Sequence, residues 1–109
     1  MGNEFLTVLT AMDKKSDADG LARMLVERRL AGCVQVLGPM ESTYRWKGKV
    51  ETAQEWLCVI KCRAAGYQAV EKAIKEVHPY ETPEIIALPI VKGSREYLGW
   101  LGEATEAEA

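Results

Sequence analysis

Two long β-type runs joined by a tight turn constrain the fold of this 109-residue chain more than any other feature. The first run, 33–46, is interrupted at Gly38-Pro39, which indicates a bulge or bend on an edge strand. A turn follows at Lys47-Gly48-Lys49, where glycine supplies a positive φ, and the chain returns through 50–62. Each arm of this predicted hairpin would extend roughly 45 Å at the usual rise per residue.

A strand and a helix precede the hairpin. The apolar, β-branched run 5–11 is typical of a buried strand. Apolar residues then recur at helical spacing over 18–30, and Ser16 and Gly32 suit the N-cap and the end of that helix. The sequence therefore predicts a β-strand, an α-helix and then the hairpin.

A second helix, a strand and a third helix follow the hairpin. Residues 67–77 carry an apolar helical face, and the nearly all-apolar run 84–91 predicts a fourth strand covered on both faces. Ser94 would cap a short C-terminal helix. The order βαββαβ plus a helix predicts an α+β, ferredoxin-like sandwich in one domain over 1–109, with two helices on one face of a four-stranded antiparallel sheet.

The hairpin is longer than the predicted helices can cover. Two helices of about 12 to 15 residues span only about 20 Å, roughly half the length of the hairpin. Its distal half carries Tyr44, Trp46 and Val50, which no helix of the same chain reaches. Because an isolated two-stranded ribbon is marginal in water, we expect this end to pack on another copy of the chain, in an obligate homo-oligomer.

Composition and charge exclude several classes of partner. The formal net charge is −2 and the Lys and Arg residues are dispersed, which argues against nucleic-acid binding and against a polybasic membrane surface. Apolar runs are far shorter than a membrane-spanning helix requires. The segment Met1-Gly2-Asn3-Glu4 lacks the features of a secretory signal, so we expect a cytoplasmic protein.

The sequence offers little for catalysis. Cys33, Cys58 and Cys62 lie in apolar runs without the spacing of a redox or zinc motif, which favours buried thiols in a reducing compartment. A single histidine, His78, accompanies no recognisable nucleophile motif, and no glycine-rich phosphate loop is present. We therefore expect a binding protein and not an enzyme.

Three segments, 30–34, 44–51 and above all the run H-P-Y-E-T-P-E-I-I at 78–86, resemble the CutA divalent-cation-tolerance family. Tyr97-Leu98 and Trp100-Leu101 also fit the closing helix of that family. The resemblance implies a ferredoxin-like fold and a homotrimer like the PII signalling proteins, with β-pairing of the long hairpins between subunits. It also implies a part in the response to metal ions, and some members of the family bind copper.

His78 and a carboxylate such as Glu84 are the candidate ligands for Cu²⁺ or another divalent cation, with no cofactor otherwise required. Glu81, a thiol or the same histidine of another subunit are the other candidate partners of His78. Two soft ligands that some members carry are replaced here, at the positions of Thr10 and Val77. A structural role for His78 in positioning its loop is the alternative.

A polar and aromatic set would line a cleft between subunits in the geometry that the resemblance implies. Lys61 could hold a small anion there, as in a PII-like sensor, or it could form an ion pair with Glu51 inside the interface. The candidate cleft residues are Tyr44, Trp46, Glu51, Lys61 and Tyr80.

Overall fold

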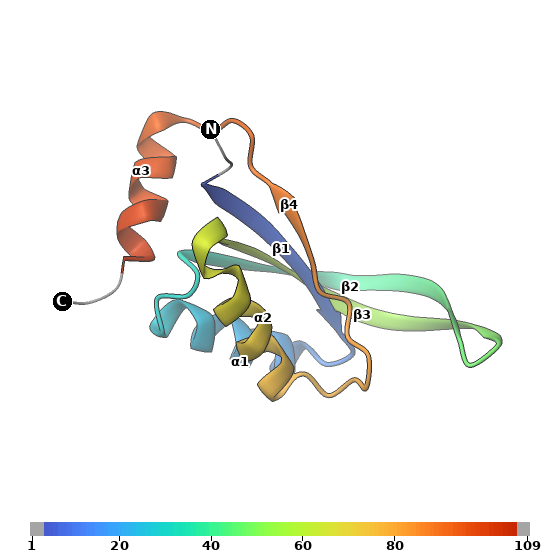
Figure 1. Cartoon of the computed structure of the whole chain (residues 1–109). Coiled ribbons are helices and arrows are strands. Elements are labelled where there is room, and N and C mark those ends of the chain that lie inside the picture. Colours follow the sequence, from blue (N-terminus) through green and yellow to red (C-terminus); the bar gives the residue numbers. More distant parts are fainter. Residues whose placement is uncertain (1–3, 107–109) are drawn as a thin grey trace.

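A four-stranded sheet in the order β2-β3-β1-β4 forms the centre of the molecule (Figure 1). Every neighbouring pair of strands is antiparallel, which confirms the predicted ferredoxin-like α+β fold. This computed structural model describes residues 4–106, so Met1–Asn3 lie outside it. The strands are β1 Phe5–Met12, β2 Cys33–Trp46, β3 Lys49–Arg63 and β4 Ile86–Pro89.

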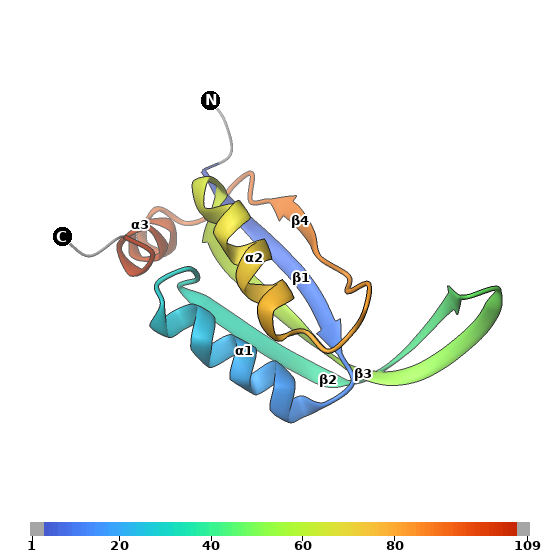
Figure 2. The same ribbon diagram turned by 60° about the horizontal axis from the view of Figure 1, so that its bottom comes forward.

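Helices α1 (Lys15–Glu27) and α2 (Tyr67–Val77) lie together on one face of the sheet, as predicted (Figure 2). A short 3₁₀ turn, Ala64–Gly66, leads into α2, and α3 (Arg95–Ala104) lies beyond the end of the sheet. The core fills the space between the two helices and the sheet. Its fully buried side chains include Val8, Leu25, Cys58, Ile60, Cys62, Val70 and Ile74.

The hairpin has the predicted turn and the predicted bulge. Lys47 and Gly48 both have a positive φ, 50° and 79°, so the two central turn residues are left-handed. The register of β2 against β3 shifts between Leu37 and Met40, on either side of the cis Gly38-Pro39 bond. Since β2 is an edge strand, this irregularity interrupts pairing on one side only.

The distal half of the hairpin projects beyond both helices (Figures 1 and 2). The whole molecule is 46 Å long but only 26 and 22 Å across. As expected from the length mismatch, Tyr44, Trp46 and Val50 are 43%, 39% and 66% exposed. In this chain, therefore, the hydrophobic part of the ribbon end is left without a covering layer.

The fourth strand departs from the prediction. It covers only Ile86–Pro89 of the predicted 84–91, and all four residues are exposed instead of covered on both faces. The strand is an edge strand paired with β1 alone. An apolar run thus identified the strand correctly, but not its exposure in the single chain.

The boundaries of the helices also differ from those predicted. Helix α1 begins at Lys15 with Lys14 at the N-cap, so Ser16 lies in the first turn and caps nothing. The helix ends at Glu27, before Gly32, because Arg29 adopts a left-handed φ of 61°. Ser94, in contrast, is the predicted cap of α3, where its Oγ accepts a hydrogen bond from the backbone N–H of Tyr97 at 3.1 Å.

The cysteines are unpaired and mostly buried, as predicted. Burial raises the pKa of both Cys58 and Cys62 to about 11, which disfavours the reactive thiolate. Across residues 4–106, no helix has the length and apolar character needed to cross a membrane.

Candidate functional site

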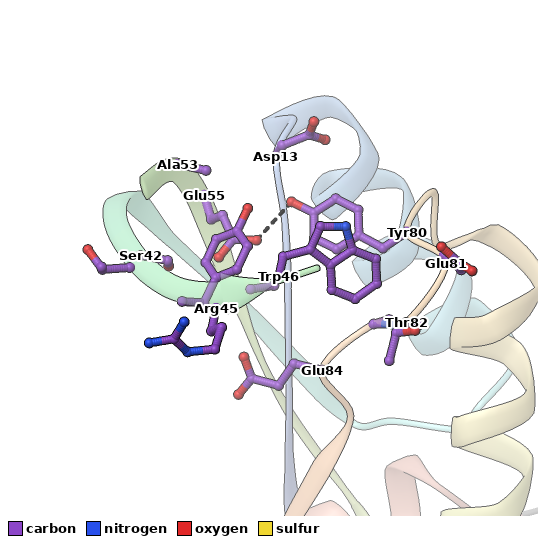
Figure 3. A pocket seen from close by; sticks show the side chains of 14 residues that line it. Asp13, Ser42, Arg45, Trp46, Ala53, Glu55, Tyr80, Glu81, Thr82 and Glu84 are labelled. Atoms are coloured by element: carbon purple, nitrogen blue, oxygen red, sulfur yellow. Dashed lines mark hydrogen bonds between the residues drawn. The ribbon is translucent and has the colours of Figure 1, made fainter. Parts of the chain in front are cut away.

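A cleft of about 820 Å³ opens where the hairpin leaves the sheet (Figure 3). Its first wall is the end of β1, with Ala11 and Asp13. The distal hairpin supplies the second wall through 42–46 of β2 together with Ala53 and Glu55 of β3. The loop 80–84, which connects α2 to β4, forms the third wall. Segments far apart in the sequence therefore meet at the last β1–β3 pair, Met12 with Trp56.

Glu55 is the most deeply buried charged residue of the cleft, at 7% exposed. The hydroxyl of Tyr80 donates a hydrogen bond to its Oε2 at 2.8 Å (Figure 3). Burial, followed by this hydrogen bond, raises the pKa of Tyr80 well above its ordinary value. Tyr80 therefore stays a neutral phenol that anchors the 80–84 loop to β3.

His78 is held by hydrogen bonds at both ring nitrogens. Its Nδ1 accepts from the backbone N–H of Tyr80 at 3.2 Å, so the proton lies on Nε2, which donates to the carbonyl of Ala11 at 2.8 Å. The ring also meets Tyr80 edge-on, with 4.8 Å between centroids. Burial lowers the pKa of His78, although the Ala11 carbonyl and the nearby carboxylates oppose this shift.

These contacts bear directly on metal binding. A neutral imidazole binds a metal through a free nitrogen lone pair, and the Nδ1 lone pair of His78 already accepts a hydrogen bond. Glu84 lines the cleft with an exposed carboxylate, but the described residues contain no group of three His, Cys, Asp or Glu side chains placed to hold a metal ion. One chain alone therefore does not fit a preformed metal site.

The structure brings together some of the predicted cleft residues. Tyr44, Trp46 and Tyr80 line the cleft together with Glu84. Glu51 and Lys61 are not among the lining residues of the single chain. Glu51 pairs with Tyr44 nearer the hairpin turn. Lys61 lies in the helix-covered part of the sheet, where it pairs with Cys33 and Thr7. Its Nζ donates a hydrogen bond to the side chain of Gln35.

Sequence reasoning missed three charged residues of the cleft. A weak signal existed for two of them, because Asp13 directly follows the first strand and Glu55 directly precedes the apolar run of the third. The sequence could not show that the 80–84 loop lies beside these two residues, because this depends on the packing of α2. The missed residues are Asp13, Arg45 and Glu55, whereas Glu81 was already a candidate ligand.

Comparison with known proteins gives a consistent result. A family model described as CutA1 divalent ion tolerance protein matches residues 6–104. A Thermus thermophilus protein named divalent-cation tolerance protein CutA is 43% identical over 98 residues, or 90% of this chain and 95% of that one. A solved structure of the Thermus thermophilus Cut A1 protein superimposes with a TM-score of 0.91 at 41% identity, covering 94% of this chain and 99% of the other.

Other organisms supply further matches. A Xenopus laevis protein named CutA homolog is 46% identical over 79% of this chain, which spans only 57% of that longer protein. A solved structure from Archaeoglobus fulgidus, described as a periplasmic divalent cation tolerance protein CutA, has a TM-score of 0.91 at 33% identity and covers 94% of this chain and 99% of its own.

Proposed function

The chain belongs to the CutA1 divalent ion tolerance family, and from this premise we propose that it is a homotrimeric binding protein in the response to divalent cations. The observation that carries the proposal is the surface left uncovered by a single chain. Large apolar side chains are exposed along the distal hairpin and along β4 and the segment after it. These residues are Trp46, Val50, Ile86, Leu88 and Val91.

An apolar surface of this kind on a small chain marks an interface. The hairpin end presents a ribbon with aromatic and β-branched residues, and β4 presents an edge with free backbone groups. Copies of the chain arranged about a threefold axis would cover both surfaces, and each cleft would then lie beside a neighbouring subunit.

Light scattering and native mass spectrometry test the assembly. Wild type should have the mass of a trimer, and Val50→Ser should raise the concentration at which the trimer dissociates by about tenfold or more. Val26→Ser is the matched control, because Val26 is also exposed, at 42%, but lies on α1 away from the hairpin. A monomeric wild type, or equal effects of the two variants, would contradict the proposal.

We further propose that a divalent cation such as Cu²⁺ binds at the cleft through Glu84, with donors from a second copy completing the site. The acidic lining of the cleft supports this placement, because Asp13, Glu55 and Glu81 accompany Glu84. His78 would join the ligand set only by giving up its bond to Tyr80 or to Ala11. No other cofactor is required by the proposal.

Calorimetric titration with Cu²⁺ and Zn²⁺ tests this cation site. Wild type should bind about one ion per chain, and Glu84→Gln should weaken binding by about tenfold. Glu41→Gln is the matched control, because Glu41 is an exposed hairpin carboxylate outside the cleft. Loss of binding in His78→Ala would show that the ring is released to ligate the ion, whereas unchanged binding would leave it a structural role. A wild type that binds neither ion would refute the cation site.

A sensor of small anions is the second candidate function. Arg45 favours it, because this guanidinium lines the cleft opposite the loop 80–84. Nucleotide-dependent thermal stabilisation that disappears in Arg45→Met would support the sensor. Stabilisation by divalent ions alone would exclude it.

We propose binding without catalysis, in the cytoplasm. Both nitrogens of His78 are engaged with the backbone, and the Cys58 and Cys62 thiols are buried, so no activated nucleophile and base pair is apparent among residues 4–106. Three unpaired cysteines suit a reducing compartment. Cell fractionation tests the location, with recovery in the periplasmic fraction as the contrary outcome.

A further inference from the structure

We propose that the cleft binds an organic cation, in which an ammonium or guanidinium group is carried on an apolar body. The inference assigns a ligand class to the cleft and so rests on the proposed binding function. It draws on three separate features of the cleft, namely its charge, its aromatic lining and its size.

The charge of the cleft is the first feature. Four carboxylates line it against the single guanidinium of Arg45. Glu55 is only 7% exposed, and among residues 4–106 its carboxylate has one hydrogen-bond partner, the neutral phenol of Tyr80 at Oε2. No described residue donates to its other oxygen, Oε1. Oε1 is not among the buried side-chain atoms that lack a partner, so it is accessible from the cleft and provides an acceptor for an incoming N–H donor.

The aromatic lining is the second feature. Tyr44, Trp46 and Tyr80 all border the cleft. Figure 3 shows Trp46 on the hairpin and Tyr80 on the opposite loop. The faces of such rings attract cations, and tryptophan does so most strongly. The structure contains one example of this preference, because the Nζ of Lys47 lies 5.7 Å from the centroid of the Trp46 ring.

The size of the cleft distinguishes an organic cation from a bare metal ion. A volume of about 820 Å³ is in the range of small-molecule sites and far exceeds what one metal ion fills. A metal ion also needs several ligands converging on one point, which the described side chains of one chain do not provide. An organic cation needs only one or two acceptors for its N–H groups and apolar surface for its body, and the cleft has both.

Benzylammonium is a suitable probe, since benzyl alcohol and benzoate are its neutral and anionic counterparts of the same shape. Calorimetric titration of the full-length wild-type protein at low salt should detect benzylammonium binding and little or none for the other two. Equal binding of benzoate, or no binding of benzylammonium, would overturn the inference.

Variants locate the binding. Glu55→Gln retains an acceptor for the Tyr80 hydroxyl but removes the charge, and it should weaken benzylammonium binding by about tenfold or more. Trp46→Leu should weaken it by about threefold to tenfold through loss of the ring face. Glu84→Gln changes an exposed side chain and provides a second charge test if Glu55→Gln fails to fold, while Glu41→Gln should bind as wild type does. Unchanged binding in the charge variants that fold would overturn the inference.

Failure of this inference and failure of the proposed function give different results. A trimer that takes up Cu²⁺ but ignores benzylammonium would leave the proposed function intact and refute the organic-cation site. A monomer that binds benzylammonium, with the expected loss in Glu55→Gln, would refute the proposed trimer and leave the organic-cation site intact. If only the dissociated Val50→Ser variant binds the probe, a side chain of a neighbouring copy fills the cleft, and the inference is overturned.

Discussion

The two halves of the hairpin have the same secondary structure in opposite environments. Near the helices, Val34 of β2 pairs with Ile60 of β3, and Ile60 is fully buried. Toward the turn, Arg45 pairs with Val50 in the same ladder, and Val50 is 66% exposed. Backbone pairing requires only a neighbouring strand, whereas burial requires a covering layer, and one chain supplies that layer to half of the ribbon only.

Replacing a core residue in the covered half of the hairpin should lower the free energy of unfolding more than any other change considered. Ile60→Ala removes a fully buried side chain, so the free energy of unfolding should fall by about 2–5 kcal/mol. Val50→Ala should lower stability only through assembly, as a loss that depends on protein concentration. Denaturant unfolding at several concentrations measures both, and equal, concentration-independent losses would contradict the distinction.

Gly38 lies at the junction of the two halves. A Cβ added there would lie 2.5 Å from Cδ1 of Trp56 and 3.0 Å from the carbonyl oxygen of Glu55. Gly38→Ala should therefore cost about 1–3 kcal/mol through overpacking, measured by thermal or denaturant unfolding. Gly20→Ala is the control, because nothing lies within 4 Å of the added carbon and helix propensity would rise. A neutral Gly38→Ala would mean that the Trp56 ring moves aside freely.

A substitution in the hairpin turn should lower stability less than a substitution at the junction. Gly48 has a φ of 79°, and no atom lies within 4 Å of an added Cβ, so only the backbone conformation penalises a side chain. Gly48→Ala should cost about 1 kcal/mol, whereas Gly48→Asn should cost less because asparagine tolerates the left-handed region. Hydrogen exchange of the turn amides would show whether the loss is confined to the free end. Identical effects of the two variants would argue against this explanation.

The smallest expected effect is the pH dependence from His78, beside the cleft. Burial lowers the pKa of His78 in the folded chain, so the unfolded chain binds the proton more readily. The stability that neutral His78 contributes is fully present above the unfolded-state pKa of about 6.5, and it is lost as pH falls toward the lower folded-state pKa. Unfolding free energies measured from pH 7.5 to 5 should decline less in His78→Asn than in wild type. Parallel declines would assign the pH dependence to other groups.

Much of the fold was predictable because it depends on local pattern. Glycine at the turn, the interruption at Gly38-Pro39 and the cap at Ser94 each act through the backbone of a few residues, and the structure has all three. The start of α1 was not predicted, because Lys14 serves as its N-cap without any side-chain hydrogen bond. The prediction that β4 is covered on both faces was wrong for this chain, since hydrophobicity alone does not say which atoms will cover a strand.

The sequence by itself determined the order of the elements, the length of the hairpin and the excess of apolar surface at its end, because these follow from residue type and spacing. It also placed Tyr44, Trp46, Tyr80 and Glu84 among the candidate site residues, and the structure places all four on one cleft.

Only the tertiary structure decided how those residues are used. The return of the 80–84 loop onto the end of β1 occupies both nitrogens of His78 and joins Tyr80 to Glu55, residues 25 positions apart in the chain. Such contacts depend on how α2 packs across the sheet, which no local pattern specifies. Packing therefore gave a backbone-holding role to the residue that the sequence made the first candidate for binding a metal.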